Sequence, residues 1–243
     1  MRKLRRLTEA EIIAEFLRGE FFQKEYEADR DRFASLVEHP NLTDARENEI
    51  RRILLFRRRD TMWWELPEDR QWWEIEFDPE DVERVSVFPR AHWRKIARGN
   101  FKALDVTARV RQLQETGPNE FVQKISDICA NLSSDLPQGM VIFLGIDEDR
   151  PVTLLEGNHR FIAALLAGGP QHLRRTRMVA VFSPQMEKCC WYKTNLRTLA
   201  RCLKNRIQHS WDRDTDLAWL RAATSATGNL GAFAGNTRAL KSK

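Results

Sequence analysis

The first sixty residues have the apolar spacing of amphipathic helices. Large apolar side chains recur every three or four positions after Thr8-Glu-Ala-Glu11, a capping box that satisfies the first amides of a helix. A second helical stretch begins near Thr43 and ends at the three arginines of residues 57–59, where positive charge suits a helix C-terminus. We therefore predict that residues 1–60 form a helical N-terminal region.

Further along the chain, a wholly apolar run predicts a buried strand that is followed at once by a helix. The run Val152–Leu155 stops at Glu156-Gly157, and helical spacing then continues to Gly168-Gly169. An earlier helix is predicted to begin after Gly117-Pro118, with Asn119 as its cap. The sequence thus places a tight turn between the strand Val152–Leu155 and the helix after it.

This turn carries the candidate chemistry. Free amides and the helix dipole make a helix N-terminus an anion site, and Gly157 would let a ligand approach the backbone. Asn158 follows at the helix start. His159 and Arg160 add donors and charge, and Arg160 can hold phosphate oxygens in pairs. The alternative for His159 is a capping role toward the backbone.

The segment Glu156-Gly157-Asn158-His159-Arg160 resembles the signature of the ParB/sulfiredoxin superfamily. Its Gly-x-His-Arg form is closer to sulfiredoxin and the ParB-like free serine kinases than to partitioning ParB, where the last pair is usually Arg-Arg. The surroundings are similar over about residues 73–183. They look like the family's opening strand and turn, the helix before its central strands, and two flanking strands: Trp73–Val82, Phe121–Leu132, Met140–Gly145 and Met178–Phe182.

The resemblance implies an α/β (α+β) fold, in which residues 61–185 form a small mixed sheet of ParB/sulfiredoxin type. It also implies a nucleotide, ATP or another, whose phosphates lie at Gly157, Asn158, His159 and Arg160. Sulfiredoxin has a cysteine where this chain has Asn158, so sulfinic-acid repair is not expected. On the preceding helix Lys124 stands at the family's serine position and Phe121 at its lysine position, so Lys124 is the candidate phosphate contact there.

Glu156 and His159 are the candidate catalytic residues of a nucleotide-dependent phosphotransferase or ATPase. Such chemistry mainly needs positioning and charge neutralisation. Glu156 would hold Mg²⁺ or act as a base toward an acceptor hydroxyl; pairing with a nearby arginine is the alternative. The acceptor, a small molecule or a protein side chain, would meet the basic segment that contains Arg90, His92 and Arg94.

Two other functions stay open. The net charge of +5 and three short clusters of arginine suit an anionic partner, such as the DNA of a DNA-binding or nuclease-like ParB relative. Solvated helix faces also explain these clusters, and no helix-turn-helix pattern follows the sheet segment. The clusters are Arg51-Arg52, Arg57-Arg58-Arg59 and Arg174-Arg175. The third function is a non-catalytic interaction module whose motif only caps a helix.

Two groups of unusual residues have structural explanations. Trp63-Trp64 and Trp72-Trp73 could stack on a base, although rings at this density more often cover a core edge. Cys189-Cys190 with Cys202 and His209 do not match the spacing of common zinc sites, since adjacent cysteines rarely both bind one ion. No metal centre is therefore predicted.

The rest of the chain predicts a cytoplasmic protein without a membrane partner. The whole chain of 243 residues contains no apolar stretch long enough to span a bilayer. Its four cysteines are too few for a disulfide scaffold. In residues 186–221 an apolar stripe (Leu196, Leu199, Leu203 and Ile207) predicts C-terminal helices packed on the central domain. In residues 222–243 Ala, Thr, Ser, Gly and Asn dominate with few large side chains, which predicts a disordered tail.

Overall fold

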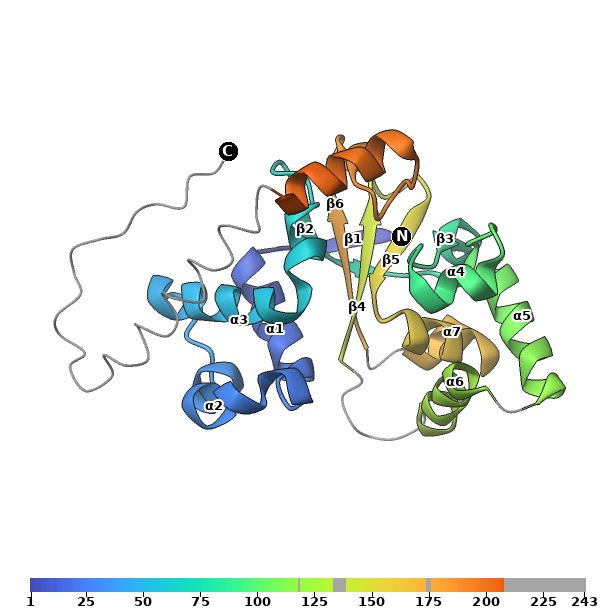
Figure 1. Ribbon diagram of the computed structural model, residues 1–243, viewed down its shortest axis with the longest axis horizontal. Coiled ribbons are helices and arrows are strands. Elements are labelled where there is room, and N and C mark those ends of the chain that lie inside the picture. Colours follow the sequence, from blue (N-terminus) through green and yellow to red (C-terminus); the bar gives the residue numbers. More distant parts are fainter. Residues whose placement is uncertain (118, 133–138, 174–175, 208–243) are drawn as a thin grey trace, which may run out of the picture.

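A computed structural model describes residues 1–117, 119–132, 139–173 and 176–207. The described residues form a six-stranded mixed sheet in the order β1-β2-β6-β4-β5-β3 (Figure 1). The α/β (α+β) prediction with a mixed sheet is therefore confirmed. The strands are β1 (Arg2–Leu7), β2 (Gln71–Glu76), β3 (Val85–Ser86), β4 (Met140–Gly145), β5 (Val152–Glu156) and β6 (Arg177–Phe182).

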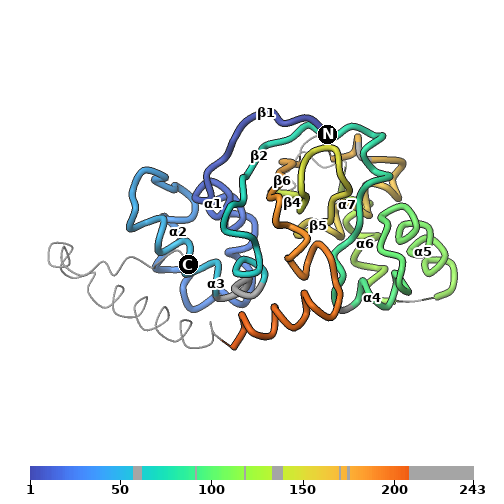
Figure 2. The backbone as a smooth tube through the Cα atoms, turned by 90° about the horizontal axis from the view of Figure 1, so that it is seen from above, coloured from blue at the N-terminus to red at the C-terminus, as the bar shows by residue number. Residues whose placement is uncertain are grey.

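Two groups of helices lie on opposite sides of this sheet (Figures 1 and 2). One group is α1 (Glu9–Glu20), α2 (Arg30–Glu38) and α3 (Ala45–Trp64). The other is α4 (Ala91–Ala97), α5 (Ala103–Thr116), α6 (Glu120–Asn131) and α7 (Asn158–Leu166). Short 3₁₀ turns are η1 (Lys24–Asp29), η2 (Pro79–Arg84), η3 (Pro170–Leu173) and η4 (Met186–Lys188), and a further helix runs from 196 to 207.

The central strand β4 shows why both faces need cover. Its side chains alternate between two cores, with Ile142 and Leu144 packed toward the α1–α3 side and Val141 and Phe143 toward the α5–α7 side. All of β4 is buried, and it pairs in parallel with β6 and antiparallel with β5. A strand that is apolar on both faces can only lie in the middle of a covered sheet.

The N-terminal region is not purely helical, which corrects the prediction for residues 1–60. Arg2–Leu7 forms β1, which pairs antiparallel with β2 at the sheet edge. Charged residues dominate this strand because an edge strand is largely solvated, and charge also discourages pairing with other chains. A second correction concerns α3, which continues past residues 57–59 to Trp64.

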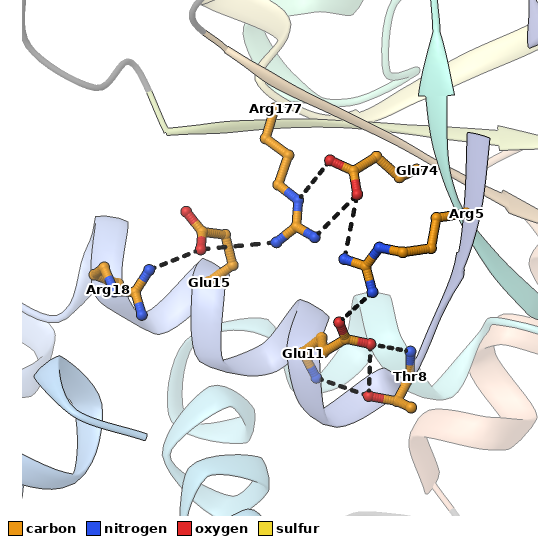
Figure 3. A network of polar contacts seen from close by, with 7 residues as sticks. All are labelled: Arg5, Thr8, Glu11, Glu15, Arg18, Glu74 and Arg177. Carbon is orange, nitrogen blue, oxygen red and sulfur yellow. Dashed lines mark hydrogen bonds and ion pairs between the residues drawn. The ribbon is translucent and has the colours of Figure 1, made fainter. Parts of the chain in front are cut away.

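A network of ion pairs fixes α1 against the sheet (Figure 3). Arg5 of β1 reaches Glu11 of α1 at 2.7 Å and Glu74 of β2 at 3.2 Å. Arg177 of β6 shares Glu74, at 3.4 Å, and also contacts Glu15 of α1. Single surface pairs contribute about 1 kcal/mol at most. Their joint effect here is to set the position of α1, whose predicted capping box at Thr8 is present.

The helix of residues 196–207 differs from the packing that its sequence predicts. The predicted apolar stripe is exposed; Leu196 is 87 % accessible and Leu203 61 %. The buried side chains on this helix are Thr198 and Cys202 instead. The leucines and the isoleucine recur at regular helical spacing, but the face of this helix that packs on the rest of the protein carries the smaller side chains. The predicted tail, residues 222–243, lies outside the described residues.

Candidate phosphate-binding cleft

An open cleft of about 610 Å³ lies where α4, α6 and α7 meet. Helix α6 begins there because the side chain of Asn119 accepts from the amides of Phe121 and Val122, as the sequence predicts. The cleft is lined by His92, Asn119, Glu120, Phe121, Lys124 and His159. Three of the predicted ligand-binding residues, His92, Lys124 and His159, therefore share one cavity although they come from three helices.

His159 is held at the floor of this cleft by aromatic rings. Its imidazole centroid lies 4.9 Å from that of Phe121 and 5.1 Å from that of Trp93. Phe121 also packs against His92, at 5.4 Å. These contacts fix the orientation of the His159 ring because they restrict both side-chain torsions. The side chain is half-buried.

The surroundings of His159 disfavour its protonated form. Burial, the largest cause, acts together with the charges of Lys124, Arg160 and His92 to lower the pKa of His159 to about 4, against the opposing effect of Glu156. His159 is therefore neutral at pH 7, with one nitrogen that donates and one that accepts. An anion in the cleft would offset the charge of Lys124 and favour the protonated imidazole.

Gly157 shapes the turn before α7. It is the N-cap of α7, with φ of +81°, and its Cα faces strand β4. A Cβ at this position would lie 2.7 Å from Cγ2 of Val141 and 3.1 Å from the carbonyl oxygen of Met140. Glycine is needed here because the turn requires a positive φ and because the sheet approaches the backbone closely.

Asn158 and Arg160 also point into the protein. The Asn158 carboxamide is buried, and its Oδ1 accepts from the amide of Phe88 at 2.8 Å. Arg160 donates from Nη1 to the carbonyl oxygen of Met140 at 2.8 Å, and burial lowers the pKa of its guanidinium. Neither lines the cleft. The five-residue motif thus divides, with His159 facing the cleft and Gly157, Asn158 and Arg160 joining α7 to its neighbours.

Glu156 lies at the end of β5 and accepts from the amide of Gly157 at 3.0 Å. The charge of Glu156 acts to raise the pKa of His159, but Glu156 does not line the cleft. Among the described residues, the side chains around the cleft form no group of three candidate metal ligands. The residues that line the cleft therefore do not by themselves form a Mg²⁺ site.

Of the three residues predicted to bind the acceptor, only one lines the cleft. His92 lines the cleft, whereas the guanidinium of Arg90 lies 3.5 Å from the ring centre of Trp191. This cation–π contact joins the start of α4 to the turn after η4. Arg94 is exposed on α4 and does not line the cleft.

Tryptophans of both pairs pack against other aromatic rings of the protein. Trp63 is buried and stacks on Trp72 with ring centres 5.3 Å apart, which joins α3 to β2. Trp64 packs on Phe56, also at 5.3 Å.

The structure brings together one cluster that the sequence does not predict. Ligand atoms of Glu65, Cys190 and Cys202 all lie within 4.8 Å of one another in the interior. The two cysteines were conspicuous in sequence, but the carboxylate comes from the distant end of α3, so no local spacing could have revealed it. His209 lies outside the described residues.

Comparison with protein-family models, curated proteins and solved structures gives no match to this chain. The resemblance to the ParB/sulfiredoxin superfamily therefore stays a prediction from the motif and its surroundings. Within the described ranges, none of the helices combines the length and apolar character that a membrane crossing requires.

Proposed function

We propose that this chain binds the phosphate groups of a nucleotide in the cleft between α4, α6 and α7, and that it transfers a phosphoryl group to a small-molecule or side-chain acceptor. The observation that carries the proposal is the meeting of Lys124 and His159, from two different helices, in one open cleft at the capped start of α6. The motif resemblance supports a nucleotide as the source of the phosphate.

The charges of the cleft favour an anionic ligand. Lys124 and His92 are exposed at its rim, and Lys124 helps to keep the imidazole of His159 neutral. A phosphate would accept a hydrogen bond from His159 and would compensate Lys124, while the amides at the start of α6 add partial positive charge. Glu120, which also lines the cleft, opposes this attraction and would limit how deeply an anion binds.

The shape of the cleft suits a ligand larger than phosphate alone. A volume of about 610 Å³ lies within the range of small-molecule sites, roughly 300–1,000 Å³. The rings of His92 and Phe121 at its edge offer flat faces on which a base could stack. In the proposed reaction the neutral His159 would accept the proton of the acceptor hydroxyl while the hydroxyl oxygen forms its bond to the terminal phosphorus of a nucleoside triphosphate. The bond to the nucleoside diphosphate would break, the diphosphate would leave, and Lys124 would stabilise charge on the transferred group.

The test is a thermal-shift screen of the full chain against ATP, ADP, GTP and CTP, each with and without Mg²⁺. A nucleotide present at about 100 times its Kd stabilises a protein by about 2.7 kcal/mol, which raises Tm by several degrees. Lys124→Ala should abolish this shift. Lys24→Ala, which removes an exposed lysine of η1, is the matched control and should retain it.

Turnover is measured separately, as release of labelled phosphate and as its transfer to candidate acceptors. His159→Gln should stop transfer while Lys124 still supports weakened nucleotide binding. If no nucleotide shifts Tm, or if Lys124→Ala binds as tightly as the wild type, the proposal is wrong. Salt-sensitive binding of duplex DNA that survives Lys124→Ala would favour the nucleic-acid alternative.

A further inference from the structure

Three polar side chains from distant parts of the chain converge in the core on the side of α3. Glu65 follows the last residue of α3, Cys190 lies in the turn after η4, and Cys202 lies on the helix 196–207. Their accessibilities are 7 %, 1 % and 6 %, and both cysteines are free. Burying a carboxyl beside two thiols is unfavourable unless strong partners compensate.

The partners inside the protein are weak. The side-chain amide of Asn205 donates to Glu65 at 3.1 Å, and the thiols of Cys190 and Cys202 lie close to each other and to that carboxylate. Thiols are poor donors. Burial raises the pKa of Glu65, although the nearby charges of Arg201 and Arg206 partly oppose this. The side chains of the cluster therefore offer more ligand atoms than the strong hydrogen bonds around them can satisfy.

We propose that Glu65, Cys190 and Cys202 form a binding site for a zinc ion. Two sulfurs and one carboxylate oxygen suit Zn²⁺ rather than the hard cations, which prefer oxygen alone. Their atoms lie within 4.8 Å of one another, so shifts of about 1 Å bring all three to zinc–ligand distances. A water molecule takes the fourth tetrahedral position.

The charge balance is consistent with this site. On binding, Cys190 and Cys202 each release a proton to solvent, and the ion forms two Zn–S bonds and one Zn–O bond. Two thiolates and one carboxylate carry three negative charges against the two positive charges of the ion. Arg201 and Arg206, whose charges act on Glu65, compensate the remainder, and Asn205 holds the carboxylate in orientation.

The neighbouring Cys189 provides a matched control. It is as buried as Cys190, but its sulfur does not belong to the cluster. Adjacent cysteines thus have separate roles, in agreement with the rule that they rarely bind one ion together. Cys129, which is half-buried on α6, is a second control.

The experiment uses the full chain, stripped with a chelator and kept reduced, and titrates it with Zn²⁺ alone. We expect one zinc per chain by mass spectrometry, a rise in Tm, and sulfur-to-metal charge-transfer absorption when Co²⁺ replaces zinc. Cys190→Ser and Cys202→Ser should each weaken zinc binding by about 100-fold or more, and Glu65→Gln, which preserves the packing, by at least about 10-fold.

Cys189→Ser and Cys129→Ser should bind zinc as the wild type does. The wild-type Co²⁺ spectrum tests the site even where a variant fails to fold. Absence of zinc uptake by the reduced wild type, or full uptake by Cys190→Ser, would overturn the proposal. It would also be overturned if mild oxidation removed two thiols and formed a Cys190–Cys202 disulfide while zinc gave no protection.

Discussion

Gly157 and Val141 approach each other so closely that a Cβ on the glycine would lie 2.7 Å from the valine Cγ2. The contact joins the first residue before α7 to the central strand β4. Because Gly157 also has φ of +81°, two independent constraints exclude a side chain at this position. The glycine of the motif therefore sets where α7 begins, and through α7 it sets where His159 enters the cleft.

Gly157→Ala should destabilise the fold by about 2–4 kcal/mol, the sum of a strained positive φ and overpacking against β4. Urea unfolding followed by circular dichroism measures this change. Gly19→Ala is the control, since a Cβ there meets nothing within 4 Å and the residue lies in α1. It should stabilise by about 0.5–1 kcal/mol. Equal stability of the two variants would show that β4 yields to the added methyl group.

Asn158→Ala should cost about 1–3 kcal/mol, because the buried amide of Phe88 loses its acceptor and water cannot replace it. The same unfolding measurement reports the loss. Asn131→Ala, at an exposed position near the end of α6, should stay within about 0.5 kcal/mol of the wild type. If Asn158→Ala were instead neutral in stability but defective in nucleotide binding, Asn158 would have the ligand role that the motif suggests.

The pKa of His159, about 4, makes stability depend on pH in a defined window. The unfolded chain binds a proton near pH 6.5 and the folded chain only near pH 4, so the unfolded state holds more protons between these values. Stability therefore falls as pH decreases from about 6.5 to 4, by up to about 3 kcal/mol. NMR titration of the His159 ring gives the pKa, and denaturation at several pH values gives the slope.

His159→Gln should flatten this pH dependence between 6.5 and 4, whereas His39→Gln, at an exposed position, should leave it unchanged. Inorganic phosphate should raise the pKa of His159, because an anion in the cleft favours the imidazolium. A titration near pH 6.5 without phosphate would mean that the ring is more hydrated than its contacts with Trp93 and Phe121 imply.

The sequence predicts local features of this protein well. The capping residues Thr8 and Asn119 act within three residues of themselves, and the run Val152–Leu155 needs only its own apolar character to mark a buried strand. The charged strand β1 was missed because its partner β2, rather than an apolar face, stabilises it as a strand. The sequence pattern thus predicts an element when the residues of that element are enough to stabilise it, as they are not for β1.

The candidate site shows the limit of such prediction. The motif places His159 and Arg160 side by side in sequence, but successive residues of a helix point about 100° apart, so only one of them faces the cleft. Lys124 and His92 reach the same cleft only because α6 and α4 pack beside α7. The cluster of Glu65 with two cysteines depends on the meeting of the end of α3 with the turn after η4 and the helix 196–207, which no spacing within these segments specifies.

Arg51 gives a last prediction, because a residue expected on a solvated or DNA-binding face is fully buried. Its guanidinium donates to the carbonyl oxygens of Leu36 and Asn41, at 3.1 and 2.9 Å, and so holds the turn between α2 and α3. Arg51→Ala should cost about 3–5 kcal/mol, since those acceptors and the carboxylate of Glu47 lose their donor. Arg52→Ala, which breaks a half-exposed pair, should cost about 1 kcal/mol or less. Urea unfolding distinguishes the two, and a DNA-binding defect in Arg51→Ala without loss of stability would contradict the structural role.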